Sequence, residues 1–258
     1  MNPVKIIFFD IDGTLVDPAS GNIPAKTRET LKLLHQKDVL LCIATGRPNA
    51  SLPDFGGLHF DAFCTFNGSL CYTEKESIHS DPIPPKAVRK VIQNAAAIGR
   101  PVSAALRHRL VANGWDEDLA GYYQLAGLEL TVADDFEAAC EEEIYQIMLG
   151  CREPDHPDII RGADGVAITF SWARAADVIP TGSGKAQAID KILAYYQLNP
   201  SQAMAFGDGM NDMEMLRTVG TGVAMGNADA RLKAIADDVC GPVGEDGIYH
   251  YCVSHGLI

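Results

Sequence analysis

The fold is decided by one stretch near the start of the chain, Val4-Lys5-Ile6-Ile7-Phe8-Phe9-Asp10-Ile11-Asp12-Gly13-Thr14-Leu15. Its first half is almost continuously apolar, which is typical of a strand buried on both faces of a parallel sheet. Asp10 and Asp12 follow directly, where open α/β sheets bind ligands. Alternate residues of an extended chain face the same way, so the two carboxylates can converge. This pattern indicates a cation site, or a nucleophile beside an acid/base; a simple turn that uses Asp and Gly for its geometry is the alternative.

A second polar piece follows the next predicted strand. Residues 39–44 are again continuously apolar and end in Thr45-Gly46. A helix predicted over about 25–36 joins the two strands into a right-handed βαβ unit, which places Thr45 beside the end of the first strand. Thr45 offers a hydroxyl and Gly46 an accessible backbone N–H, so the pair can bind an anion, although Thr and Gly can also simply turn the chain.

The third piece is Lys185, at the start of a helix predicted over 185–197. A positive charge is unfavourable at a helix N-terminus unless an anion joins it. Gly184-Lys185 does not belong to a nucleotide-binding P-loop, because Ile179 occupies the required first glycine position and Ala186 the position of the magnesium-binding Ser or Thr.

The fourth piece follows an apolar strand that begins near Ala203. It reads Gly207-Asp208-Gly209-Met210-Asn211-Asp212 and again puts carboxylates at a strand end. A strand near 222–224, a helix near 228–236, a strand near 239–240 and a last helix after Asp246-Gly247 complete a doubly wound α/β pattern with a parallel, Rossmann-like sheet.

The middle of the chain has a different character. A proline cluster at 81–85 suggests a linker, and mixed helices and strands follow it. We expect helices near 86–98 and 117–126, and strands near 102–106, 110–112, 145–150, 166–170 and 176–179. The sequence therefore predicts a core domain of residues 1–80 and 181–258, with an α+β domain on an antiparallel sheet inserted at 81–180.

Composition narrows the class of protein. The chain has 258 residues, 47% of them hydrophobic, and a net charge of −13, which argues against a nucleic-acid partner. No apolar run approaches the ~20 residues of a membrane span, and no leader segment is recognisable, so we expect a cytoplasmic protein without a membrane partner. Seven cysteines without a CxxC argue against a disulfide framework or a zinc site. Nothing in the sequence sets the oligomeric state.

Taken together and in this order, the four pieces resemble the motifs of the haloacid dehalogenase (HAD) superfamily of phosphotransferases: Asp10-Ile11-Asp12-Gly13-Thr14 the first, Thr45 the second, Lys185 the third, and Gly207-Asp208 with Asn211-Asp212 the fourth. Ala44-Thr45-Gly46-Arg47, Asn67-Gly68 and the Gly-Asp-Gly-x-Asn-Asp run are similar to the Cof-type sugar-phosphatase branch, subfamily IIB. That branch carries an inserted cap between its second and third motifs, where 81–180 lies here. One departure is Ser-Gly-Lys-Ala around Lys185, where the branch more often has Ser-Lys-Gly.

The resemblance implies a Mg²⁺-dependent phosphatase. Asp10 would be the nucleophile that forms an aspartyl-phosphate. Magnesium would be bound by Asp10 and Asp208 through their side chains and by Asp12 through its backbone carbonyl, which leaves the Asp12 side chain free as general acid and base. Phosphoryl oxygens would be held by Thr45, Gly46, Lys185 and Asn211, and Asp212 would support Lys185 or the waters on the metal.

The resemblance also implies a small phosphorylated metabolite as substrate, with the cap selecting its leaving group. Hexose and pentose phosphates are the first expectation, and cofactors such as flavin mononucleotide or pyridoxal phosphate the second. Two alternatives remain open: a phosphosugar mutase of the same superfamily, and a non-catalytic sensor of phosphometabolites. Loss of Asp10 or Asp12 would mark a sensor, and both are present.

Overall fold

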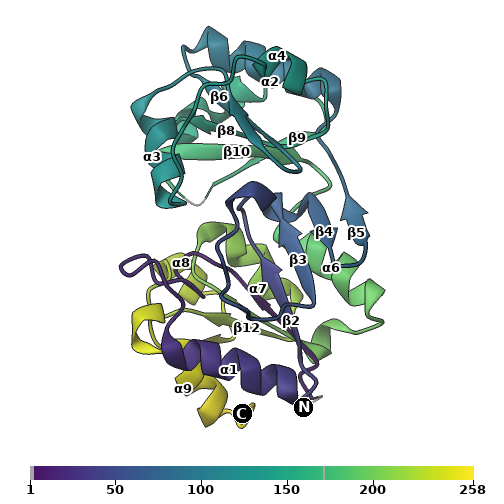
Figure 1. Cartoon of the computed structure of the whole chain (residues 1–258), viewed down its shortest axis with the longest axis vertical. Helices are drawn as coiled ribbons and strands as arrows, with labels where there is room; N and C mark the ends of the chain where they lie inside the picture. Colours follow the sequence, from purple (N-terminus) through teal and green to yellow (C-terminus); the bar gives the residue numbers. More distant parts are fainter. Residues whose placement is uncertain (1–2, 171) are drawn as a thin grey trace.

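The computed structural model describes residues 3–170 and 172–258, and its strands form two sheets that lie one above the other along the long axis (Figure 1). Within these residues the larger sheet has eight strands in the order β13-β12-β11-β1-β2-β3-β4-β5. Their bounds in that order are Asp238–Val239, Thr221–Ala224, Ala203–Gly207, Ile6–Phe9, Leu40–Ala44, Ala62–Thr65, Leu70–Tyr72 and Ser77–Ser80.

The strands from β13 to β3 run parallel, which confirms the predicted doubly wound sheet. β4 and β5 extend it as antiparallel strands. Asn67-Gly68, a dipeptide typical of hairpin turns, joins β3 to β4 through a short 3₁₀ turn at Phe66–Gly68. β5 was not predicted: its alternation is too short and polar to show as a strand, and it forms by pairing with β4.

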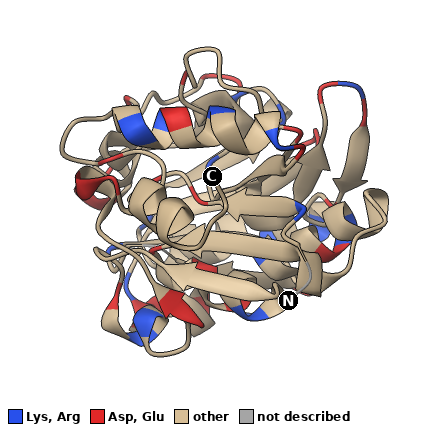
Figure 2. Cartoon of the chain, turned by 90° about the horizontal axis from the view of Figure 1, so that it is seen from below, with Lys and Arg blue, Asp and Glu red and all other residues tan. Residues whose placement is uncertain are grey.

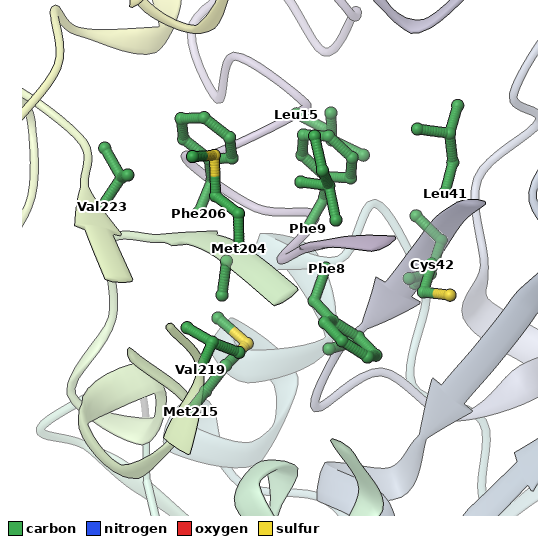
Figure 3. Close-up of a cluster of buried hydrophobic side chains, with 14 of the residues drawn as sticks. Phe8, Phe9, Leu15, Leu41, Cys42, Met204, Phe206, Met215, Val219 and Val223 are labelled. Atoms are coloured by element: carbon green, nitrogen blue, oxygen red, sulfur yellow. The ribbon is translucent and has the colours of Figure 1, made fainter. Parts of the chain in front are cut away.

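Helices cover both faces of this sheet because β1 is apolar on both. Phe8 and Phe9 point to opposite sides of the strand (Figure 3). Phe9 stacks on Phe206 with ring centroids 5.5 Å apart, and Phe206 meets Tyr251 of α9 (Gly247–Ser254), which packs beside α1 (Ala25–Gln36). On the other side lie α6 (Lys185–Tyr195) and α7 (Met213–Thr218), the source of the Met215 side chain near Phe8. Burying one such aromatic side chain contributes about 1.5–3 kcal/mol.

Charged residues are few in the strands of the larger sheet. Seen from below, Lys, Arg, Asp and Glu colour mainly helices and loops, while the strands of the larger sheet are mostly tan (Figure 2). None of the helices in the described part of the chain is long and apolar enough to cross a membrane.

The second sheet has, within the described residues, five antiparallel strands in the order β7-β6-β8-β10-β9. In that order they span Leu110–Ala112, Val102–Leu106, Ile144–Gly150, Ala175–Pro180 and Val166–Thr169. Its helices are α2 (Pro85–Ala97), α3 (Glu117–Leu125), α4 (Phe136–Ala139) and α5 (His156–Ile159). α2 and α4 lie on the side of this sheet that faces away from the larger one (Figure 1). All these elements fall inside segment 81–180, whose boundaries as a domain stay a prediction.

The two sheets each have their own apolar cluster, and a third cluster joins them. In the third cluster Phe66, from the larger sheet's β3–β4 turn, stacks on Tyr145 of β8 at 5.2 Å. The chain passes between the sheets near Asp81 and again near Ser183, and the Ser183 hydroxyl donates a hydrogen bond to Asp81 at 3.2 Å.

One element is shorter than expected. The helix predicted near 228–236 is only α8 (Ala230–Lys233), capped by Asp229, whose side chain accepts the N–H of Arg231 at 2.8 Å. The chain leaves the helix early because Asp237 must reach β12, where its carboxylate accepts the N–H of Gly222 at 2.8 Å.

Candidate active site

The four polar pieces of the sequence meet at one edge of the larger sheet. Asp10 follows β1, Thr45 follows β2, Asp208 follows β11, and Lys185 opens α6. The strands involved are neighbours and parallel, so their carboxyl ends bring these side chains to one place.

A buried ion-pair triad forms the floor of the site. The Lys185 ammonium donates to Asp10 Oδ1 and to Asp212 Oδ1, both at 2.6 Å. Burial alone would lower the pKa of Lys185, but the two carboxylates outweigh it and hold that pKa above its usual value. Asp212 is further fixed because its Oδ2 accepts the N–H groups of Asp208 and Gly209 at 3.0 and 2.9 Å. Lys185 is therefore charged and held at the side of Asp10.

Negative charge exceeds positive charge around Asp10. Burial raises the pKa of Asp10 well above its usual value; Lys185 opposes this, while Asp212, Asp208 and Asp12 add to it. Burial, followed by repulsion from Asp212, raises the pKa of Asp208 to about 7, although the Thr14 hydroxyl donates to its Oδ1 at 3.0 Å. Several neighbouring carboxylates share a single lysine, so negative charge is in excess here.

The residues fit a hard divalent cation. Oxygen atoms of Asp10, Asp208 and Asp212 lie within 4.8 Å of one another. Clustered carboxylates are the ligands that Mg²⁺ prefers, and a cation there would relieve the repulsion that raises their pKa values. Gly13 has φ +78°, and a Cβ at this position would collide with the Asp208 carboxylate, so only glycine allows the loop to pass so close.

Asp12 is held by an arginine, Arg47. The Arg47 guanidinium binds the Asp12 carboxylate through two hydrogen bonds, Nε to Oδ2 at 2.8 Å and Nη2 to Oδ1 at 2.7 Å. Its Nη1 donates to the carbonyls of Ser51 at 2.7 Å and of Ala126, just past the end of α3, at 3.2 Å. Arg47 thus sets the direction of the Asp12 side chain and contacts the second sheet's segment. In the sequence, its place directly after Thr45-Gly46 was the only indication that it belongs to the site.

Three of the expected phosphate-binding residues, Thr45, Gly46 and Asn211, line the same cavity as Asp10. Thr45 is buried, and its hydroxyl accepts the N–H of Arg47 at 3.1 Å. A Cβ on Gly46 would lie 2.9 Å from the Asn67 amide oxygen, and Asn211 Nδ2 donates to that same oxygen at 3.2 Å. Asn67, which the sequence showed only as part of the Asn67-Gly68 pair that resembles the Cof-type branch, is therefore in contact with the site.

A cavity of about 800 Å³ opens over these residues. On the side of the larger sheet it is lined by Asp10, Asp12, Thr45, Gly46, Asp208 and Asn211, while Lys185 and Asp212 lie beneath this lining. On the other side, residues of the second sheet's segment close it, among them Tyr122, Gln146 and Trp172. The Tyr122 and Trp172 rings are stacked with centroids 6.3 Å apart. The cavity can hold a small molecule between a polar, carboxylate-rich wall and an aromatic one.

Comparison with known proteins agrees with this geometry. The model of the haloacid dehalogenase-like hydrolases matches residues 7–252. The chain is 35% identical over 98% of both chains to the putative phosphatase YkrA of Bacillus subtilis, and 30% identical to an HMP-PP phosphatase of Shigella flexneri, covering 98% of this chain and 96% of the relative. The solved structure of a HAD subclass IIB sugar phosphatase superposes with a TM-score of 0.91 at 32% identity, covering 99% of this chain and 100% of that one.

The chain belongs to the haloacid dehalogenase-like hydrolase family. Its relatives place it in subclass IIB, the Cof-type branch, and it is a phosphatase.

Proposed function

We propose that the protein is a Mg²⁺-dependent phosphatase that hydrolyses small phosphomonoesters through an aspartyl-phosphate on Asp10. The observation that carries the proposal is the Asp10 carboxylate itself. It faces a cavity of about 800 Å³, is flanked by Lys185 at 2.6 Å, and has a second carboxylate, Asp12, lining the same cavity. A nucleophile, a fixed cation and an acid/base at one strand end are the groups that phosphomonoester hydrolysis needs.

In the first step Asp10 attacks phosphorus, and the bond from phosphorus to the leaving oxygen breaks. Asp12 donates a proton to that oxygen, so that an alcohol departs. In the second step Asp12 takes a proton from water as the water oxygen attacks the phosphorus of the aspartyl-phosphate. The bond between the Asp10 oxygen and phosphorus breaks, so that inorganic phosphate leaves and the Asp10 carboxylate is regenerated.

Positive charge and hydrogen-bond donors make this attack feasible. Mg²⁺ bound by Asp10, Asp208 and the Asp12 carbonyl would neutralise charge between the phosphate and its carboxylate nucleophile. In this proposal the Thr45 hydroxyl, the Gly46 N–H, Lys185 and the Asn211 amide would hold the phosphoryl oxygens and stabilise their charge in the transition state. Asp212 positions Lys185 through their 2.6 Å ion pair.

We infer that residues 81–180 form the cap that selects the leaving group, over a core of residues 1–80 and 181–258. The aromatic pair Tyr122 and Trp172 suits the apolar face of a sugar or a heteroaromatic ring. Sugar phosphates remain the first candidates and flavin mononucleotide or pyridoxal phosphate the second; the relative named HMP-PP phosphatase adds that compound to the panel. The predicted cytoplasmic location is part of the proposal.

The test is phosphate release from this panel with Mg²⁺ and with EDTA, for the wild type and for Asp10→Asn. We expect Mg²⁺-dependent release that Asp10→Asn abolishes. Conversion of a hexose phosphate to its isomer without phosphate release would instead identify a mutase. Binding of panel compounds without any turnover would identify a sensor.

A further inference from the structure

The β3–β4 turn has a backbone that its residue types do not favour. Phe66 and Asn67 have φ values of 53° and 52°, in the left-handed region. Asn tolerates this region, but a bulky phenylalanine rarely adopts it, and it persists only where its surroundings enforce it. Such residues concentrate at functional sites, so the contacts of this turn are informative.

Contacts from both sheets enforce the conformation. The N–H groups of Phe66 and Asn67 donate to the carbonyls of Arg47 and Thr45, each at 3.1 Å, so the turn is bound to the loop after β2. From the other side the Phe66 ring stacks on Tyr145 of β8 at 5.2 Å. A Cβ on Gly68 would collide with the carbonyl of Gly184, the residue before Lys185. The turn is therefore clamped between the catalytic edge and the second sheet.

The Asn67 side chain connects the catalytic edge of the larger sheet to the second sheet. It is 2% exposed, and its Oδ1 accepts from Asn211 at 3.2 Å. Its Nδ2 donates to Asp177 Oδ2 of β10 at 3.1 Å and lies 3.4 Å from Gln146 Oε1 of β8. An amide has one accepting and one donating end, and here the carboxylate of Asp177 sets which end faces Asn211.

Asp177 is itself held from the cavity side. The Tyr122 hydroxyl donates to both of its oxygens, at 3.1 and 2.9 Å, and Tyr122 lines the cavity. Asp177 is 2% exposed, and no step of the hydrolysis uses it. An apolar residue at a buried position is often as stable as a charged one, so stability alone is a weak reason for a carboxylate here.

We propose that Asn67 is a positioning residue: anchored by Asp177 of the second sheet, it holds the Asn211 amide toward the phosphate site. Through it, the orientation of Asn211 depends on the second sheet being seated on the larger one. The inference rests on the proposed function only for the phosphate-binding role of Asn211. If the network were merely structural, its loss would lower stability and leave phosphate affinity unchanged.

Asn67→Gly is the sharpest variant, because glycine accepts the left-handed backbone and removes only the amide. Gln197→Gly is the matched control: Gln197 is an exposed amide residue with φ 56°, in the turn after α6. We measure inorganic phosphate binding in the presence of Mg²⁺ by calorimetry. Loss of a positioned hydrogen bond predicts about 5- to 10-fold weaker binding for Asn67→Gly and no change for Gln197→Gly.

A double-mutant cycle tests whether Asn67 acts through Asn211. If it does, adding Asn67→Gly to Asn211→Ala changes phosphate affinity less than about 2-fold, because the group being positioned is already gone. Full additivity of the two effects, or a fall in melting temperature of Asn67→Gly with unchanged phosphate affinity, would overturn the proposal.

The anchoring step has a readout that does not depend on phosphate. In ¹⁵N-labelled protein, Asp177→Asn should move the side-chain NH₂ signals of Asn211, whereas Asp177→Ala should move them further. Unmoved Asn211 signals in both variants would refute the relay even in an active enzyme. A wild type that neither binds nor releases phosphate would refute the proposed function, and these signals would still decide the relay.

Discussion

The stability of Asp177→Asn relative to the wild type should increase as the pH rises. Burial raises the pKa of Asp177 from its usual 3.8 to about 7, against the opposing hydrogen bonds from Tyr122 and Asn67. A carboxyl whose folded pKa is raised binds its proton more tightly in the folded state. The contribution of the protonated Asp177 carboxyl to the free energy of unfolding is therefore complete below pH 3.8. It is lost as the pH rises toward 7. The full difference between the folded and unfolded pKa of Asp177 corresponds to at most about 4 kcal/mol in the free energy of unfolding.

The assay is urea unfolding of the wild type and Asp177→Asn at pH 5, 6, 7 and 8. Asparagine cannot ionise, so the free energy of unfolding of the variant minus that of the wild type should grow by about 2–3 kcal/mol between pH 5 and 8, most of it below pH 7. Taking this difference cancels the titration of Asp10 and Asp208, which both proteins share.

Asp118→Asn is the matched control, because the pKa of Asp118 is shifted in the opposite direction. Asp118 is buried too, but arginines including Arg152 and Arg174 outweigh its desolvation and lower its pKa. Its contribution is present above pH 3.8 and lost only in stronger acid, so the difference from the wild type should be flat from pH 5 to 8. A flat difference for Asp177→Asn as well would show that Asp177 ionises normally, and the reasoning about its burial would fail.

Three further outcomes follow from the site. Lys185→Met leaves the Asp10 carboxylate buried without its cation, so the free energy of unfolding of the metal-free protein, measured in urea, should fall by about 3–5 kcal/mol. Added Mg²⁺ should restore part of this loss. Equal stability of variant and wild type would contradict the ion-pair triad. Arg47→Lys keeps the charge but not the two-point grip on Asp12, and should lower kcat/KM for a phosphomonoester about 10-fold; an unchanged value would mean that Asp12 needs no such hold. Mg²⁺ at 100 times its Kd should raise the free energy of unfolding by about 2.7 kcal/mol in the wild type and far less in Asp208→Asn; an equal rise in both would place the metal elsewhere.

Local sequence patterns were sufficient for the parallel part of the larger sheet. The unbroken apolar runs before Asp10 and Thr45 predict strands buried on both faces, and the parallel neighbours β1 and β2 confirm this. The strands expected over 102–106 and 110–112 match β6 and β7, which pair as antiparallel neighbours. The order of the four motifs, together with their resemblance to a known superfamily, was enough for the family and the class of enzyme.

Local patterns failed where an element owes its form to a distant partner. β5 exists because β4 lies beside it, and α8 ends early because Asp237 binds the N–H of Gly222. Neither partner can be found from residue periodicity, because periodicity reports which face of an element is buried and not which element buries it.

By itself, the sequence determined the parallel strands of the larger sheet and their polar ends, and hence the candidate residues Asp10 and Asp12; the start of the helix after Gly184 gave Lys185 in the same way. Only the tertiary structure decided what holds these groups in place: Arg47 on Asp12, and the chain of contacts from Asn211 through Asn67 to Asp177. Asn67 and Asp177 are 110 residues apart in sequence and bond only because the second sheet packs over the first. The residues next to a strand end in the sequence are enough to predict it. A hydrogen bond between two sheets depends on how the sheets pack against each other, and no local sequence pattern predicts that packing.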